Sequence, residues 1–494
     1  MTRPAVSVVA VCGLLAVGLG AAAATGPEAP RTTRSSEVRS VPVARATGVC
    51  PDPATNTSMV SRAGVATPSG LATGGGTAGS GSLELGDLGG NGAPRVSLSS
   101  SPSSAVKPIP PHSAPLVATA SGSLAPGFAA SMVTRGVSGD LRGLSGTSCV
   151  APGTDFWFVG AGAVVGQRGR LYLTNAESAA AVVDVTLFGP DGPIDTPAGR
   201  GIAVAAGAQE VRLLDALSPD TAWIAVHVQV HQGKVAAALR DQQVAGLEPR
   251  GTDWVPAAAA PARHVVVPGV PAGAGERRLQ VLVPGDSDAI IRLRLIGRDG
   301  SFAPAGLDVL QAEAGSVTDV DLAPYAKGQD VAVDLTSDVP VAAGLLARVG
   351  PATGGPAELA YTAGTPALTP AQPGVAALAW FGSATHSTLA LAAPGADAQV
   401  RVVPLPPATG QPVDVRVPAG TATVVDLATV TRETLYAVAV VPAPGSGPVV
   451  ASRQISEVAP RGPLITVEPV QPGRFAVRVP SVSADLSTGL RPRR

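Results

Sequence analysis

The 494-residue chain contains few aromatic and few charged side chains: Phe, Trp and Tyr make up 3% of it and charged residues 14%. Its only lysines are Lys107, Lys234 and Lys327, so that nearly all of its positive charge is arginine, and the formal net charge is −1. A chain without a basic face has nothing that would attract a phosphate backbone. We therefore expect no nucleic-acid partner.

Large apolar side chains are also scarce. The hydrophobic share is 45%, but most of it is alanine and valine, while 59 glycines and 48 prolines interrupt the chain. Such a composition places turns throughout and argues against long helices. The length suffices for about three to five domains. Thin alanine and valine cores suit narrow sandwiches of short strands better than one large enzyme core.

The amino terminus carries an export signal. Arg3 precedes an apolar run over residues 6–19, and alanines 22–24 offer a cleavage site. Residues 5–24 also have about the 20 apolar positions that span a bilayer. Two interpretations stay open, a cleaved signal peptide and an uncleaved membrane anchor. Both place the protein in the cell envelope or outside the cell, with membrane contact only through this segment if it is retained.

Three cysteines remain to be explained. Cys12 lies inside the apolar run, which leaves Cys50 and Cys149 as a pair. In an oxidising exterior, a pair of cysteines predicts a disulfide, which would close a loop of about 100 residues. The alternative is two buried free thiols.

An internal repeat organises most of the chain. Residues 206–214 recur at 314–322 and 419–427, each copy being an Ala-Gly turn followed by alternating apolar and polar residues. An arginine follows each of these glycines by 33 residues, namely Arg240, Arg348 and Arg453. Three shared registers indicate a tandem array. The run of residues 128–135, which ends at Arg135, resembles the later arginine-terminated runs.

Period-two alternation identifies the repeated unit as β structure. Val183, Val185 and Leu187 share one face, and Asp191-Gly192 then predicts a hairpin turn. About six or seven short strands per repeat describe an all-β fold of tandem antiparallel, immunoglobulin-like β-sandwich units.

These patterns divide the chain into seven segments. Proline-rich joints at 256–271 and 365–373 separate units and favour a semi-rigid rod. The predicted segments are 1–24, signal peptide or membrane anchor; 25–44, flexible linker; 45–150, degenerate N-terminal β unit; 151–250, 251–368 and 369–460, three β-sandwich units; and 461–494, closing strand and tail.

Two sets of residues are candidate contacts. Trp157, Trp254 and Trp380 each precede the opening strand of a unit, where they would either fill a sandwich core or, if exposed, stack on sugars. The three repeated arginines would either pair with carboxylates of the next unit and set the angle between units, or be solvated.

No catalytic constellation is found. A Gly-x-Ser-x-Gly elbow is absent. His227 and His231 share a strand face, which we expect to be exposed, but are about 13 Å apart, too far to bind one metal ion. Asp286 and Asp288 are better explained by turn chemistry than by calcium. We expect no enzymatic activity, no cofactor and no metal.

The sequence also resembles a family of actinobacterial envelope proteins that is known only as a domain of unknown function. The likeness covers roughly residues 45–485 and is carried by LYLTN at 171–175, DVTLFGPDG at 184–192, VVVPGVP at 265–271 and GLDV at 306–309. The resemblance implies export and an association with the cell envelope, and it brings no catalytic residues. Our leading hypothesis is a non-enzymatic scaffold or spacer; the alternative is a glycan- or protein-binding module, with cell-wall polysaccharide or another envelope protein as partner.

Overall fold

Strands form where apolar and polar residues alternate in the sequence. The structure is a computed structural model that describes residues 39–479 except 54–57, 69, 72–79, 91, 352–354 and 381. In β12 (Ala181–Gly189), Val183, Val185 and Leu187 are buried while Asp184 and Thr186 between them are half-buried. The predicted antiparallel, all-β fold is confirmed.

The second sandwich, the clearest in the sequence, consists of two sheets. Their strand orders are β10-β16-β12-β13, with β14 also paired to β12, and β15-β11-β17-β18. Both the first strand, β10, and the last, β18, therefore lie at sheet edges. The strands are β10 (Asp155–Ala161), β11 (Arg170–Thr174), β12, β13 (Gly192–Ile194), β14 (Ile202–Val204), β15 (Gln209–Leu213), β16 (Ile224–Gln232), β17 (Ala236–Ala245) and β18 (Glu248–Val255).

The first sandwich has the same strand order, in the region where the sequence was least legible. Its sheets are β2-β7-β4-β5 and β6-β3-β8-β9. Its strands are β2 (Arg45–Cys50), β3 (Val60–Thr67), β4 (Gly81–Asp87), β5 (Val96–Leu98), β6 (Ser103–Ile109), β7 (Leu116–Gly122), β8 (Ala129–Gly136) and β9 (Gly143–Ser148).

The fourth sandwich repeats the order again, as β27-β32-β29-β30 and β31-β28-β33-β34. Its strands are β27 (Gly374–Trp380), β28 (Thr385–Ala393), β29 (Ala398–Pro404), β30 (Val413–Val417), β31 (Thr421–Asp426), β32 (Leu435–Pro442), β33 (Val450–Ala459) and β34 (Gly462–Pro469).

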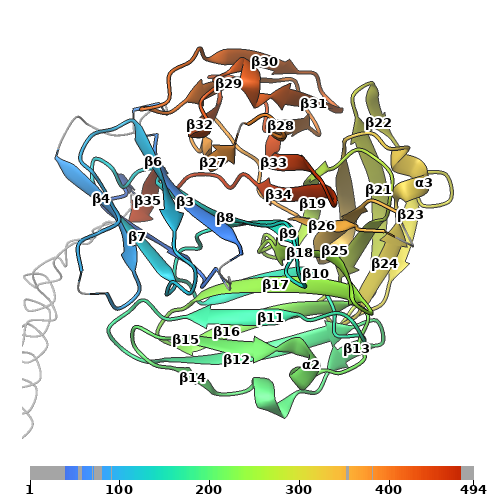
Figure 1. The fold of residues 1–494 in the computed structure, drawn as a ribbon. Helices are drawn as coiled ribbons and strands as arrows, with labels where there is room; N and C mark the ends of the chain where they lie inside the picture. The colour runs from blue at the N-terminus through green and yellow to red at the C-terminus, as the bar shows by residue number, and fades with distance from the viewer. Residues whose placement is uncertain are drawn as a thin grey trace, which may run out of the picture. The chain divides into compact units, whose positions relative to one another are not determined.

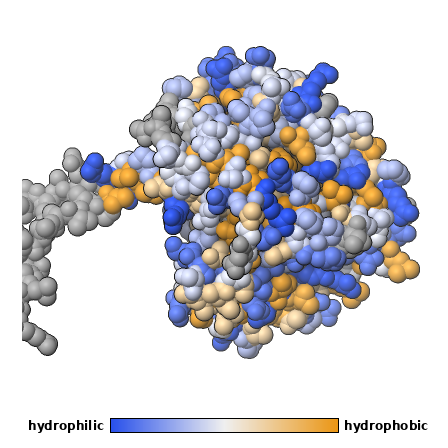
Figure 2. Space-filling model, turned by 60° about the vertical axis from the view of Figure 1, so that its left-hand side comes forward, coloured by the Kyte–Doolittle hydropathy of each residue, from blue (hydrophilic) through white to orange (hydrophobic). Residues whose placement is uncertain are grey.

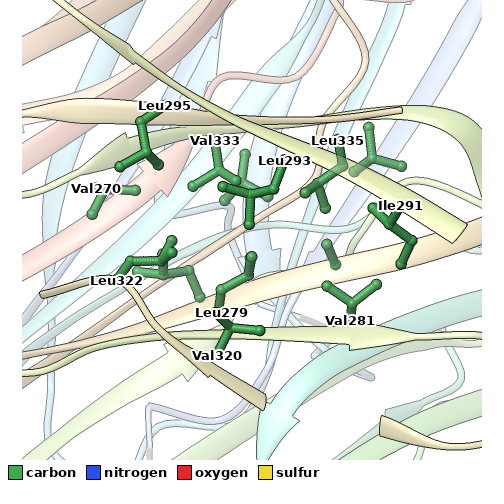
Figure 3. Packing of buried hydrophobic residues seen from close by; sticks show 14 of the residues in the cluster. Val270, Leu279, Val281, Ile291, Leu293, Leu295, Val320, Leu322, Val333 and Leu335 are labelled. Carbon is green, nitrogen blue, oxygen red and sulfur yellow. The ribbon is translucent and has the colours of Figure 1, made fainter. Parts of the chain in front are cut away.

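The third sandwich differs in one respect. Its strand β25 (Val331–Val349) is 19 residues long and pairs with β19 and β21 through its first part and with β20 and β26 through its second. One strand thus joins both layers, around the buried Val and Leu side chains of Figure 3. The other strands are β19 (Ala262–Val270), β20 (Arg277–Leu282), β21 (Ala289–Gly297), β22 (Gly300–Phe302), β23 (Val309–Ala312), β24 (Val317–Asp321) and β26 (Glu358–Ala363).

The repeated Ala-Gly turns share one backbone conformation. Gly207, Gly315 and Gly420 have φ values of 65°, 70° and 70°, the left-handed region that glycine adopts without steric cost. The strand that follows is in each case an edge strand: β15, β24 or β31. The sequence repeat is therefore a repeat of a turn and the edge strand that it opens.

In the part of the chain that the structure describes, helical structure consists of single turns. These are η1 (Pro197–Gly199), α2 (Leu214–Leu217), α3 (Ala323–Ala326) and η2 (Leu427–Thr429). Within the described residues, no helix has the length and apolarity needed to cross a membrane. The predicted signal or anchor, residues 1–24, and most of the predicted linker, 25–44, lie outside the described residues.

The prediction of a semi-rigid rod is wrong, because residues 42–477 form one compact unit. The last strands of the four sandwiches, β9, β18, β26 and β34, contact one another in its interior (Figure 1). The sequence pattern identified the strands and their buried faces, whereas contacts between sandwiches depend on the edges of the sheets, about which alternation says nothing.

The segment after the fourth sandwich lies along the first. Val43 N donates to the carbonyl oxygen of Phe475 and Gly127 N to that of Arg474, each at 3.0 Å. A Cβ at Gly127 would lie 2.3 Å from Cζ of Phe475, so that only glycine leaves room for this ring. Beyond it, β1 (Arg39–Pro42) pairs with β35 (Ala476–Val479) in a two-stranded sheet. The two ends of the described chain are thereby joined.

The predicted disulfide is present. Cys50 ends β2 and Cys149 directly follows β9, so the bond links the two sheets of the first sandwich. It closes a loop with a sequence separation of 99 residues.

Replacing both cysteines with serine should lower the free energy of unfolding by about 2–4 kcal/mol, because the unfolded chain regains the freedom of this loop. Calorimetric unfolding of both proteins measures the effect. A reductant should lower the transition temperature of the wild type and leave that of the double variant unchanged; equal transitions without reductant would contradict a stabilising role.

Candidate functional site at the junction of the four sandwiches

One buried carboxyl group connects all four sandwiches. Asp253, on β18 of the second sandwich, is fully buried. Its Oδ1 accepts hydrogen bonds from Gly146 N of β9 at 3.1 Å and from Thr466 Oγ1 of β34 at 3.0 Å. Its Oδ2 accepts one from Tyr361 N of β26 at 3.2 Å. The first, fourth and third sandwiches are therefore each bonded to a single side chain of the second.

The approach of the strands requires glycine at position 251 and favours it at position 146. A Cβ at Gly146 would lie 3.0 Å from Thr466 Oγ1 and 3.1 Å from Nη2 of Arg453, and one at Gly251 would lie 2.4 Å from Leu359 N. The missing side chains let the backbones come close enough for the bonds to Asp253.

A second buried carboxyl belongs to Glu358 of β26. Its Oε1 accepts hydrogen bonds from Thr252 N at 3.2 Å and from Leu359 N at 3.0 Å. The Nη1 atom of Arg142, in the turn between β8 and β9, lies 4.0 Å from Oε2. Arg142 also donates to the carbonyl oxygens of Ala357 and Pro463, at 3.2 and 2.9 Å. This buried guanidinium of the first sandwich thus contacts the third and the fourth.

Burial dominates the electrostatics of both carboxyls. Desolvation raises the pKa of Asp253 and that of Glu358 well above their ordinary values. Hydrogen bonds from backbone amides lower each pKa, and so does Arg142 for Glu358, but these effects are smaller. Both groups are consequently held toward the protonated form in the folded chain.

A third buried acid, Asp241 of β17, joins the second and third sandwiches. Its Oδ2 accepts hydrogen bonds from the hydroxyl of Tyr361 at 2.5 Å and from the side-chain amides of Gln167 and Gln243 at 2.9 Å each. Burial raises the pKa of Asp241 and, well above its ordinary value, that of Tyr361. The tyrosine therefore stays a hydrogen-bond donor.

The three repeated arginines lie around this junction, and their contacts differ from the predicted pairing with the next unit. Arg240 is buried and donates from Nη1 to the carbonyl oxygen of Pro53, in the preceding sandwich, at 3.5 Å. Arg348 donates to Gln243, also in the preceding sandwich, at 2.8 Å. Arg453 is buried and pairs with Glu468 of its own sandwich, which also accepts a hydrogen bond from Ser148 of the first.

Sequence reasoning gave no role to the fourth member of this set. Arg135 of β8 pairs with Glu457 of β33, and Nε lies 2.6 Å from Oε2. The available signal was its place at the end of an apolar run, as in the three later arginines. Through this pair the first sandwich is bonded to the fourth.

The tryptophans occupy boundaries between sandwiches. Trp157, in β10, is buried against Leu282 and Val317 of the third sandwich. Trp254 lies in the last strand of the second sandwich and belongs to the buried cluster of the first. Trp380, in β27, is half-buried, and the guanidinium carbon of Arg62 from the first sandwich lies 4.3 Å from its ring centroid. These positions leave no contiguous platform of exposed tryptophans in the described chain.

The prediction of an exposed His227 is wrong. Its side chain is stacked on Trp157 with ring centroids 3.6 Å apart, and its Nε2 lies 2.8 Å from Oδ1 of Asp155. Desolvation lowers the pKa of His227, although Asp155 opposes this shift. Alternation correctly gave the outward direction of the imidazole, but the third sandwich covers that face. His231 remains exposed and contacts Asp184.

A cavity of about 850 Å³ lies where the segments between sandwiches meet. Its walls come from the first, second and fourth sandwiches, from residues 149–154 and 255–259 of two joints, and from residues 471–474. Most wall residues are alanine, valine, proline or glycine, and Lys234, Arg474, Asp155 and Glu468 contribute charge.

On the face of the molecule shown in Figure 2, hydrophobic residues occur in separate groups bordered by hydrophilic ones.

Comparison with known proteins identifies the family but no activity. Residues 99–428 match the model of a family of unknown function (DUF5719). The chain belongs to that family. A solved structure, "Crystal Structure of Thermotoga maritima 1070", is similar at 18% identity over 21% of this chain and 93% of that one, with a TM-score of 0.19. No curated protein matches. Among the described residues, no group of three or more His, Cys, Asp or Glu side chains could hold a metal ion.

Replacing Asp253 with alanine should lower the free energy of unfolding by about 3 kcal/mol, because the buried Tyr361 amide and the Thr466 hydroxyl lose their acceptor, while Gly146 N keeps Thr466 Oγ1 at 2.9 Å. Urea denaturation of the full chain measures it. Asp414→Ala, at a carboxyl with 78% of its side chain exposed, should stay within about 0.5 kcal/mol of the wild type. Equal effects of the two substitutions would remove Asp253 from its central role.

The raised pKa of Glu358 predicts a pH dependence. The folded chain holds this proton to higher pH than the unfolded chain, whose glutamates titrate near about 4.3. Protonated Glu358 makes its full contribution to stability below the pKa of the unfolded chain, and this contribution is lost as the pH rises through the pKa of the folded chain. Glu358→Gln should therefore flatten the fall of unfolding free energy with rising pH, measured by urea denaturation at several pH values. The control variant Glu248→Gln, at an exposed position, should keep the wild-type dependence of unfolding free energy on pH. An unchanged dependence in Glu358→Gln would mean that the carboxyl is ionised in the folded chain and would contradict the prediction.

Proposed function

We propose that this chain is a non-enzymatic, exported cell-envelope protein that acts as a structural scaffold or spacer. The observation that carries the proposal is the bonding of Asp253 to the three other sandwiches. The buried charged residues around it serve the same end, since Arg142, Arg240 and Glu358 each contact a neighbouring sandwich. A protein whose buried charges hold four sandwiches in one body is suited to bear load and to keep other molecules at fixed separation.

Export is supported by the sequence of residues 3–24 and by the disulfide. Cys50 and Cys149 form a bond of the kind that persists in oxidising compartments and is rare in the cytosol. The family resemblance adds association with the envelope. The proposal also includes three narrower statements: the sandwiches have immunoglobulin-like topology, the protein comes from an actinobacterium, and it is secreted.

The second candidate is a binding module for a glycan or a protein at the cell wall. The cavity favours it, because its volume is within the range of about 300–1,000 Å³ usual for ligand sites. The tryptophans that would stack on sugars are instead engaged between sandwiches. This arrangement supports a protein ligand over a glycan.

Cell fractionation tests export. The full chain should appear in the envelope or the medium, and Cys50 and Cys149 should react with maleimide only after reduction. A chain without residues 2–24 should remain in the cytoplasm with reactive thiols. A full chain that stays cytoplasmic and reduced would contradict the proposal.

Complementation separates a scaffold from a binding module. In cells that lack the gene, a scaffold with an obstructed cavity should still restore the envelope phenotype. Thr154→Trp places a large side chain at an exposed position of the cavity wall and serves as that variant. Restoration by Thr154→Trp but not by Asp253→Ala supports the scaffold; failure of a folded Thr154→Trp chain supports binding.

A further inference from the structure

We propose that the 850 Å³ cavity binds an extended acidic peptide with small side chains, a ligand class that gives the second candidate function a defined site. The inference rests on that candidate and not on the scaffold role. Three features of the cavity carry it: the charge that is free, the strand edges in the wall and the size of the wall side chains.

The two cations of the cavity wall outnumber its one carboxylate without a cationic partner. Of the two carboxylates, Glu468 pairs with the buried Arg453 and accepts a hydrogen bond from Ser148. Asp155 contacts His227, but desolvation lowers the pKa of that imidazole and favours its uncharged form, so this contact does not cancel the charge of the carboxylate. The two cations, Lys234 and Arg474, are exposed, and in the described part of the chain neither side chain has a hydrogen-bond or ion-pair partner. A ligand that carries carboxylates would complement both.

Edges of sheets form part of the wall. Residues 46–48 of β2 and the first residues of β10 line the cavity, and each strand is the outermost of its sheet. Val49 directs its backbone groups away from β7, since it exchanges hydrogen bonds with Val150 at 2.8 and 2.9 Å. Alternate residues of an antiparallel strand point the same way, so Thr47, two residues earlier, presents its N–H and C=O toward the cavity. Such an edge pairs with an extended peptide.

Wall side chains limit what fits. Alanine is the most frequent residue of the wall, with Ala46, Ala129, Ala151 and Ala257 among its members, and Phe128 contributes a partly buried aromatic ring. A surface of methyl groups accommodates small side chains of a peptide. It provides no exposed tryptophan on which a sugar ring would stack. The combination favours a peptide over a wall glycan.

Fluorescence anisotropy with the full exported chain tests the proposal. The probe is a labelled ten-residue peptide that alternates alanine and glutamate, and its matched control has glutamine at every glutamate. We expect the acidic peptide to bind and the glutamine peptide to bind about tenfold more weakly or not at all. Equal binding of the two peptides would overturn the role of Lys234 and Arg474.

Variants locate the site. Lys234→Gln combined with Arg474→Gln should weaken binding of the acidic peptide about tenfold, and Thr154→Trp should abolish it. The matched control combines Lys107→Gln with Arg461→Gln, two exposed cations outside the cavity wall, and should bind as the wild type does. Circular dichroism confirms that each variant is folded. Undiminished binding by Thr154→Trp would place the peptide elsewhere and overturn the proposal.

Soluble cell-wall glycan fragments, added as unlabelled competitors, should leave the anisotropy unchanged. Displacement of the peptide by these fragments, or their binding in its place, would overturn the peptide assignment in favour of a glycan. Failure of every peptide to bind would also overturn it. Neither result bears on the scaffold function, which fractionation and complementation test separately.

Discussion

The arrangement of the four sandwiches depends on a buried acid at the place where four sheet edges meet. Edge strands expose unpaired backbone groups, and burying those groups without partners is costly. Asp253 accepts hydrogen bonds from Gly146 N and Tyr361 N, on two of the edge strands, and Glu358 accepts one from Thr252 N on a third. The carboxyls thus provide acceptors for buried amides of the edge strands, and Gly146 N also donates to Thr466 Oγ1 at 2.9 Å. Desolvation of these acids is the opposing cost, and it appears as their raised pKa values.

Around this junction, ion pairs and contacts between a cation and an aromatic ring join the sandwiches. Arg135 with Glu457 and Arg62 with Trp380 both join the first sandwich to the fourth, which are far apart in sequence. Trp157 fills the boundary between the second and third. The buried charged residues of the junction and Trp157, Trp254 and Trp380 thus lie between sandwiches, while alanine, valine and leucine make up most of the cores. That division explains how a chain with so few aromatic residues sustains one large body.

The sequence was sufficient for what lies within a sandwich. Alternation at Val183, Val185 and Leu187 predicted a buried face, Asp191-Gly192 predicted the β12–β13 turn, and the cysteines predicted the disulfide. It was insufficient for what lies between sandwiches. His227 occupies an outward position that looks solvated until another sandwich covers it, and Asp253 is one acid between a threonine and a tryptophan in an otherwise ordinary strand. Contacts between residues more than 100 positions apart leave no periodic trace in a single sequence, so the rod was inferred from the joints alone.

The bond between Arg135 and Glu457 spans 322 positions of the chain. This contact can form only in a chain that is complete as far as Glu457, and the space that Gly127 leaves is filled only when Phe475 is also present. A chain truncated before Phe475 would keep every strand of the four sandwiches and lose the ring that fastens its trailing segment to the first.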